Sequence, residues 1–159
     1  MMHGDDKGLI LPPLVAPIQV VIIPIYAKKD EQIKIDEKLK EITEILDGGK
    51  IRWKIDDRSL YHPGWKYNFW ELKGVPLRIE FGGKDLAKEQ VVVAQRIKKE
   101  KVELGISEIE RVIPEMLREI QAEMFNIAKE KVSDSIVKVE NWEEFMQKLN
   151  EKKALLAAW

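Results

Sequence analysis

The sequence predicts an α/β domain built on a mixed sheet of about five strands, with helices on its faces. Two β-branched apolar runs, at 19–25 and 90–97, are typical of buried strands. Two alternating segments, at 51–57 and 77–81, are typical of strands with one polar face. Apolar residues at helical spacing lie between and after these segments, which predicts a layered α/β fold.

The first half of the chain is predicted to form a βαβ unit. The strand at 19–25 follows a proline-containing approach, and we expect Pro24 at its end. Apolar residues then recur every three or four positions from 32 to 47, and Gly48-Gly49 ends this helix. The strand at 51–57 follows directly, as expected for parallel strands joined by a helical crossover.

The middle of the chain is rich in turns and aromatic residues. Residues 65–73, between Pro63-Gly64 and Gly74, predict one or two helical turns, whose Trp65, Phe69 and Trp70 we expect to pack on the sheet. The strand at 77–81 places Arg78 and Glu80 on one face. Turn residues at 82–85 and the strand at 90–97 then complete an antiparallel hairpin.

The last third is predicted to be mainly helical. Ser107 and Glu110 have the spacing of a capping box, and an apolar stripe continues to about residue 132. Pro114 leaves two possibilities, a kinked helix or a short turn followed by a helix with Pro114 in its first turn. A short strand at 136–139 and a helix capped by Asn141 follow.

Composition excludes several kinds of site and protein. The 159 residues contain no cysteine, so disulfides, thiolate zinc sites and iron–sulfur clusters are excluded. The two histidines lack ligand spacing, and we find no P-loop, nucleophile elbow or dinucleotide-binding motif. No apolar run reaches the length of a membrane span and no secretory leader is visible, so we expect a cytoplasmic protein without membrane contact.

Charge is segregated along the chain although the formal net charge is only −1. Residues 50–101 hold 13 Lys or Arg against 7 Asp or Glu, a balance of +6, and the remainder holds 14 against 21, a balance of −7. The basic stretch also carries seven of the twelve aromatic residues. Basic and aromatic residues interleaved in this way suit a polyanion with exposed bases, or else a core with a solvated rim.

Two segments carry a family resemblance. The run DDRSLYHPGWKYNFWELKGVPLRIEFGGKDL, at 56–86, resembles the anticodon-binding domain of archaeal and eukaryotic-type prolyl-tRNA synthetases. The opening HGDDKGLILPPLVAPIQVVIIPI resembles the junction behind their class II catalytic domain. The resemblance implies a three-layer class IIa anticodon-binding domain at 18–133, preceded at 1–17 by a catalytic-domain tail and linker. Residues 134–159 then correspond to the start of a truncated C-terminal extension.

The resemblance also implies an activity for the parent enzyme. That enzyme ligates proline to tRNA(Pro) through prolyl-adenylate, with ATP and Mg²⁺, and is typically a homodimer. Motifs 1 and 2 are missing here, and Lys7 is a motif 3 remnant, so we expect a catalytically inactive fragment that needs no cofactor and is free to be a monomer. Its expected partner is the tRNA(Pro) anticodon loop, not DNA. The family's zinc ligands belong to the missing part of the extension.

Site residues follow from the positions that match the family motif. Proline anticodons share two guanines, and Glu71 is expected to accept the guanine N–H groups while Arg78 donates to O6 and N7. Tyr67 corresponds to a stacking position. The remaining implied anticodon contacts are Lys84, Asp85 and, in a loop expected at 98–101, Lys101.

Other interpretations stay open at this stage. Glu71 could instead form a surface pair with Lys66 or Lys73, Arg78 could pair with a cross-strand acid, and Tyr67 could belong to the core. The rival functions are the anticodon domain of a threonyl, histidyl or glycyl synthetase, a stand-alone interaction module of the same fold, and a small-molecule α/β enzyme.

Overall fold

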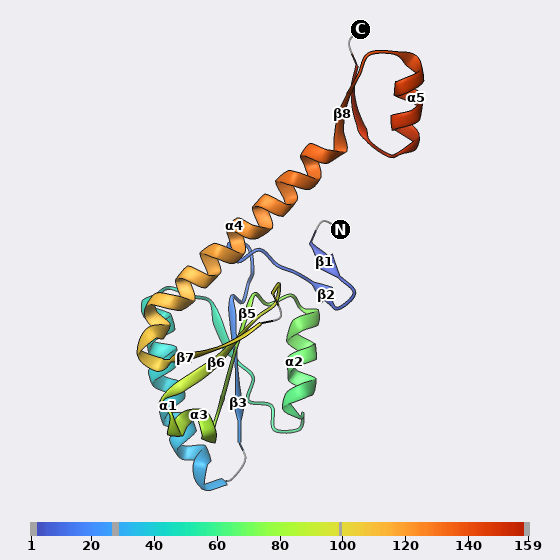
Figure 1. Ribbon diagram of the computed structural model, residues 1–159. Helices are drawn as coiled ribbons and strands as arrows, with labels where there is room; N and C mark the ends of the chain where they lie inside the picture. The colour runs from blue at the N-terminus through green and yellow to red at the C-terminus, as the bar shows by residue number, and fades with distance from the viewer. Residues whose placement is uncertain (1–2, 27–28, 99, 158–159) are drawn as a thin grey trace. The chain divides into compact units, whose positions relative to one another are not determined.

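A computed structural model describes residues 3–26, 29–98 and 100–157 (Figure 1). By the density of internal contacts the chain divides into two units, Met1–Gln121 and Ala122–Trp159. The strands are β1 Gly4–Asp5, β2 Gly8–Leu9, β3 Val20–Ile25, β4 Trp53–Ile55, β5 Leu77–Gly82, β6 Gln90–Gln95, β7 Lys101–Gly105, β8 Ile136–Val139 and β9 Ala154–Ala157. The helices are α1 Lys29–Gly48, α2 Pro63–Leu72, α3 Gly83–Ala87, α4 Ile109–Ser135 and α5 Trp142–Asn150.

The first unit contains the predicted mixed sheet. In the part of the chain that the structure describes, this sheet has five strands in the order β4-β3-β5-β6-β7. Strand β3 is parallel to both β4 and β5, and β6 is antiparallel to β5 and β7. The α/β prediction with a mixed five-stranded sheet is therefore confirmed.

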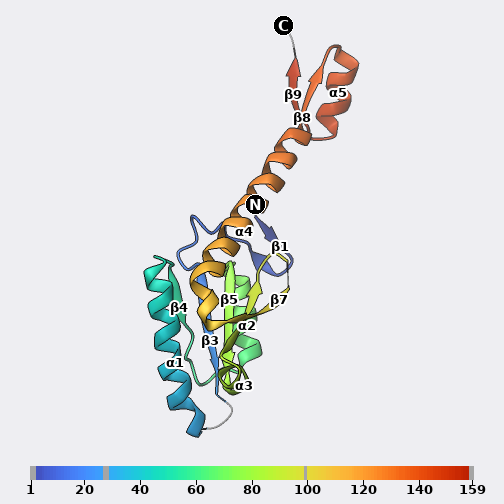
Figure 2. The ribbon, with the colours of Figure 1, turned by 60° about the vertical axis from the view of Figure 1, so that its left-hand side comes forward.

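Helices cover both faces of this sheet (Figures 1 and 2). One face packs against α1 and the first half of α4 through side chains that are fully buried, among them Ile22, Leu77, Ile79, Phe81, Ile42 and Ile113. On the opposite face Val21 and Ile23 form a smaller cluster with Trp70 of α2 and with Val75. This second face also carries the polar residues of β5, because side chains alternate along a strand.

The strands named from sequence are present with shorter bounds in some cases. The predicted strand at 51–57 is reduced to Trp53–Ile55, which pairs with Val20–Ile22. Pro24 lies past the residues of β3 that pair with β4, and its partner on the other side is Phe81 of β5. The N–H that proline lacks therefore removes no hydrogen bond between β3 and β4. The aromatic segment forms a ten-residue helix, longer than the one or two turns predicted.

Three local predictions were wrong. The turn at 82–85 is instead the start of helix α3, capped by Asp85, whose Oδ2 accepts a hydrogen bond from the Gly82 N–H at 3.0 Å. Lys101 begins strand β7 and does not lie in a loop. Ser107 lies inside a 3₁₀ turn, and it is Glu108 whose Oε2 accepts from the Gly105 N–H at 3.1 Å. Helix α3, strand β7 and the 3₁₀ turn are short and rich in charged residues. Their apolar periodicity is therefore too weak to predict them from the sequence.

The structure places Pro114 inside a helix and not in its first turn. The 3₁₀ turn at Ile106–Glu108 precedes α4, and α4 then continues through Pro114 to Ser135. Pro114 is the sixth residue of this helix, where its missing N–H removes one intrahelical hydrogen bond.

The second unit is a small βαβ arrangement. Strand β8 pairs in parallel with β9 in the register Ile136 to Ala154 through Val139 to Ala157. Helix α5 joins them and begins at the predicted cap, where the Asn141 Oδ1 accepts a hydrogen bond from the Glu144 N–H at 2.9 Å.

Candidate nucleic-acid interface

A cavity of about 190 Å³ opens on the α2 face of the sheet. Its wall combines the β1–β2 hairpin, the last turn of α2 and the neighbouring ends of β5, β6 and β7. The charged side chains that line it are Lys7, Glu71, Arg78, Arg96 and Lys101. Four cations and one acid thus surround a single hollow, the balance expected where an anion binds.

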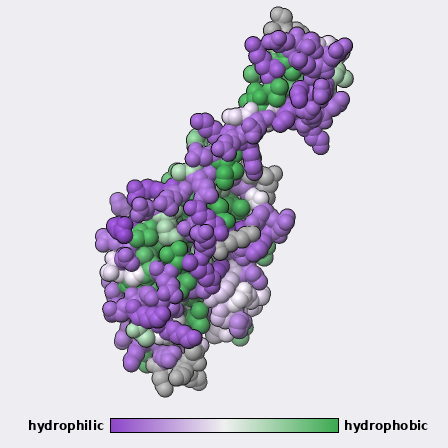
Figure 3. All heavy atoms as spheres, in the orientation of Figure 1, coloured by the Kyte–Doolittle hydropathy of each residue, from purple (hydrophilic) through white to green (hydrophobic). Residues whose placement is uncertain are grey.

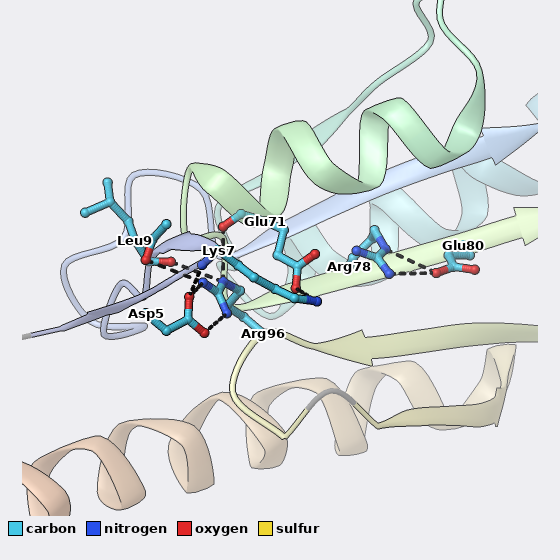
Figure 4. A network of polar contacts seen from close by, with 8 residues as sticks. Asp5, Lys7, Leu9, Glu71, Arg78, Glu80 and Arg96 are labelled. Atoms are coloured by element: carbon cyan, nitrogen blue, oxygen red, sulfur yellow. Dashed lines mark hydrogen bonds and ion pairs between the residues drawn. The ribbon is translucent and has the colours of Figure 1, made fainter.

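Strand β5 supplies Arg78 to this cavity and holds it in place with Glu80. The Arg78 Nε and Nη2 atoms donate to the Glu80 Oε1 at 3.1 and 3.0 Å (Figure 4). The Lys101 Nζ lies 2.8 Å from the Glu80 Oε2. Glu80 is only 7% exposed, so two cations compensate one buried carboxylate. Among the described residues the Arg78 Nη1 has no hydrogen-bond partner, which leaves the outer edge of the guanidinium open to a ligand.

Tyr67 lies beside the cavity wall, beneath the two cations. The Arg78 guanidinium carbon lies 4.3 Å from the centre of the Tyr67 ring and the Lys101 Nζ lies 5.5 Å from it. Burial, followed by the charge and hydrogen bonding of Glu80, raises the pKa of Tyr67 to about 12. The phenol therefore stays neutral at physiological pH and does not add a negative charge to the site.

Glu71 enters the cavity from the last turn of α2. Its Oε1 lies 3.5 Å from the Nζ of Lys7, and its side chain is one-fifth exposed (Figure 4). The surface pairs considered from sequence are not formed. Lys66 is buried and donates instead to the backbone carbonyl of Asp56 at 3.0 Å, while the Lys73 Nζ lies over the ring of Phe69 at 4.5 Å.

A buried carboxylate fixes α2 to the sheet and so determines where Glu71 and Tyr67 lie. Asp56, at the end of β4, accepts a hydrogen bond from the Trp70 Nε1 at 2.7 Å and a bidentate pair from Arg58 at 2.8 and 2.7 Å. Burial alone would raise the pKa of Asp56, but these hydrogen bonds outweigh it and lower the pKa to about 2.

Lys84 and Asp85 are not part of the cavity wall. Both belong to α3, which follows the far end of β5; Lys84 is exposed, and Asp85 caps its own helix. The structure therefore brings together Lys7, Tyr67, Glu71, Arg78 and Lys101, and leaves the other two predicted contacts outside.

Two residues of the site, Glu80 and Arg96, are not predicted from the sequence. The alternation of strand residues places Glu80 on the same face as Arg78 but does not predict that Glu80 is buried. Arg96 directly follows the apolar strand β6, and its buried guanidinium donates to the Asp5 carboxylate and to the backbone carbonyls of Leu9 and Glu71. A charged residue directly after a buried strand was the available signal.

The expectation that Trp65 packs on the sheet was wrong. Trp70 is buried as predicted, but Trp65 is 42% exposed and stacks between Tyr61 and Phe69, with ring centres 3.9 and 5.1 Å apart. Arg58 lies alongside these rings. In Figure 3 pale spheres of intermediate hydropathy lie over α2, within a mostly hydrophilic surface.

Metal-binding chemistry has no support in the described residues. Nowhere in residues 3–26, 29–98 and 100–157 do three or more His, Asp or Glu side chains gather as a ligand set. The described helices also include none that is long and apolar enough to cross a membrane.

Comparison with known proteins gives consistent matches. Residues 19–116 match a family described as "Anticodon binding domain". The chain is 43% identical to the cytoplasmic proline–tRNA ligase of Arabidopsis thaliana and 42% identical to the bifunctional glutamate/proline–tRNA ligase of Drosophila melanogaster. These alignments cover 100% and 99% of the chain, but only 30% and 9% of the two relatives.

A solved structure matches over the same range. Crystalline prolyl-tRNA synthetase from Cryptosporidium parvum, complexed with L-proline and AMP, superposes with a TM-score of 0.90 at 48% identity. The match covers 99% of this chain and 34% of that one. The chain thus spans about a third or less of the length of these relatives.

Proposed function

Because the chain belongs to the anticodon binding domain family, we propose that it binds the anticodon loop of tRNA(Pro) as one part of a longer proline–tRNA ligase. The names of the relatives and their near-complete coverage of the chain support this proposal. The longer protein would ligate proline to tRNA(Pro) with ATP and Mg²⁺ in the cytoplasm, as a homodimer. The chain alone, without that chemistry, is proposed to be inactive and monomeric, with domain bounds at 1–17, 18–133 and 134–159.

The single observation that carries the proposal is an acceptor and a donor facing one cavity. Glu71 offers two carboxylate oxygens, and Arg78 offers the free outer edge of its guanidinium. Guanine presents the complementary set, N1–H and N2–H on its Watson–Crick edge and O6 and N7 as acceptors. A pair of adjacent guanines in a splayed loop therefore matches this cavity, and each bidentate pair would contribute about 1–3 kcal/mol of discrimination against adenine.

The surrounding residues take supporting parts in this proposal. Glu80 and Tyr67 hold the Arg78 guanidinium in place. Lys101 forms a second ion pair with the Glu80 carboxylate. We assign Tyr67 a second part as a platform for a base, worth about 1–3 kcal/mol by truncation. Lys84, being exposed, would attract phosphate over a longer range, and Asp85 would contribute by fixing the start of α3.

Titration with RNA tests the proposal. The chain is titrated at one stated salt concentration with a proline tRNA anticodon stem-loop, and with the same stem-loop carrying both shared guanines changed to adenine. We expect tighter binding of the guanine form by at least about tenfold, and loss of this preference in Glu71→Ala and Arg78→Ala. Equal binding of both RNAs, or no binding of either, would overturn the assignment of guanine reading to this chain.

A further inference from the structure

The β1–β2 hairpin packs on the end of α2 that carries Glu71. The two pieces meet backbone to backbone: a Cβ added to Gly8 would lie 2.7 Å from Leu72 backbone atoms, and one added to Gly74 would lie 2.7 Å from those of Leu9. Both glycines have positive φ, +120° and +73°, a conformation that other residues rarely adopt. The Leu11 N–H also donates to the Gly74 carbonyl at 3.1 Å.

Arg96, which follows β6, joins this hairpin to α2. Its Nε donates to the Leu9 carbonyl and to the Glu71 carbonyl, each at 3.1 Å, and its Nη1 and Nη2 donate to the Asp5 carboxylate at 3.0 and 2.6 Å (Figure 4). The Arg96 side chain is only 2% exposed. The planar guanidinium thus connects the end of β6 to the hairpin and to the backbone of Glu71.

The hairpin also reaches the Glu71 side chain. Lys7, in the turn between β1 and β2, places its Nζ 3.5 Å from the Glu71 Oε1. Glu71 is therefore held twice, at its carbonyl by Arg96 and at its carboxylate by Lys7. A carboxylate oxygen has more than one acceptor direction, so an ion pair with Lys7 is compatible with guanine N–H groups on the cavity side.

We propose that Arg96 and the hairpin residues Asp5 and Lys7 are positioning residues for the anticodon-reading carboxylate of Glu71. This inference rests on the proposed function and adds to it: residues 4–9 belong to the guanine-reading site. Arg78 is held separately, by Glu80 and Tyr67 of the same face. The two halves share helix α2, but Glu71 is held by Arg96 and Lys7 whereas Arg78 is held by Glu80, so each half has polar contacts that can be removed one at a time.

That separation gives a selective test in the full 159-residue chain. Binding is measured for the guanine stem-loop and for two stem-loops in which one or the other guanine is changed to adenine. The variant Glu71→Gln identifies the guanine that Glu71 reads: it is the position at which this variant no longer prefers guanine over adenine. Arg96→Lys keeps the charge but cannot form the fork, so we expect at least about fivefold loss of preference at that guanine and less than about twofold change at the other.

Two hairpin variants extend the test. Asp5→Asn keeps the Arg96 bonds to the Glu71 carbonyl, and Lys7→Met removes only the ion pair. We expect each to lower the preference at the Glu71 guanine by about two- to fivefold, because each removes one partly exposed charged contact. Lys7→Arg should restore most of the preference. If Arg96→Lys fails to fold, judged by urea unfolding, these variants decide the question.

Arg52→Lys is the matched control. Arg52 also ties the N-terminal segment to the sheet, donating to the carbonyls of Ala16 and Pro13 at 2.9 Å, but it lies away from the cavity wall. We expect it to leave both preferences unchanged. Equal loss at both guanines in Arg96→Lys, or no loss at either, would overturn the positioning role. No guanine preference in the unmodified chain would instead overturn the proposed function itself, and this inference with it.

Discussion

The two faces of the central sheet use the same strands and are built on opposite principles. On the face covered by α1 and α4, Leu77, Ile79 and Phe81 of β5 are fully buried among aliphatic side chains. On the α2 face the alternate residues Arg78 and Glu80 form an ion pair beside a cavity. Apolar burial is non-directional and supplies stability, whereas hydrogen-bonded charges fix positions at little net gain. One face thus stabilises the fold, and the other fixes the charged side chains of the proposed binding site.

The largest effect is expected from a truncation on the apolar face, which tests whether the two faces are independent. Phe81→Ala should lower the free energy of unfolding by about 3–5 kcal/mol, because Phe81 is fully buried. Urea unfolding measures this change. In conditions where the variant remains folded, its preference for guanine should be unchanged, and a lost preference would mean that the two faces are not independent.

Lowering the pH should destabilise the α2 face by protonating Asp56. Its pKa of about 2 lies below the usual 3.8, so its contribution to stability is present above pH 4 and is lost as the pH falls toward 2. The contribution is about 2 kcal/mol. Urea unfolding of the unmodified chain and of Asp56→Asn at neutral and acidic pH measures it. Their difference in stability should shrink on acidification; a constant difference would contradict the assigned pKa.

A smaller effect is expected from the buried acid of the polar face. Glu80→Gln weakens the charged hydrogen bonds from Arg78 and Lys101, so we expect about 1 kcal/mol lower stability and a weaker preference for the guanine read by Arg78. Glu103 is the control, since the strand register places it on the same face but it is exposed. Glu103→Gln should change neither quantity, and equal effects of the two variants would show that burial of Glu80 is unimportant.

The smallest effect should come from Lys84. Because its side chain is exposed, Lys84→Gln should change stability by less than about 0.5 kcal/mol. If Lys84 neutralises a phosphate, the slope of log affinity against log salt should fall by about 1. Lys40→Gln on α1 is the control and should leave the slope unchanged. A direct base contact would instead appear as altered guanine preference.

The sequence predicted the apolar architecture better than the polar one. Long β-branched runs and helical stripes identified β3, β6, α1 and α4, because burial imposes a regular period. Strand β7, with the sequence KVELG, was missed because it is an edge strand whose first three residues are exposed.

Within the site, the sequence could name residues but not their supports. The motif resemblance selected Glu71, Arg78 and Tyr67, which the fold does bring to one place. It gave no sign that Arg96 would contact Asp5, since these residues are 91 positions apart in the chain. Contacts of that range follow from topology and leave no periodic pattern in the sequence.

The close packing of Gly8 against Leu72, and of Gly74 against Leu9, has a practical consequence for domain engineering. A chain trimmed to the matched family range, 19–116, would lack residues 4–9 and so would expose the backbone on which they pack. It would also leave the Arg96 guanidinium without Asp5 and the Leu9 carbonyl. Grafts, fusions and minimal fragments of this domain should therefore start before Gly4, and insertions should be kept out of the hairpin.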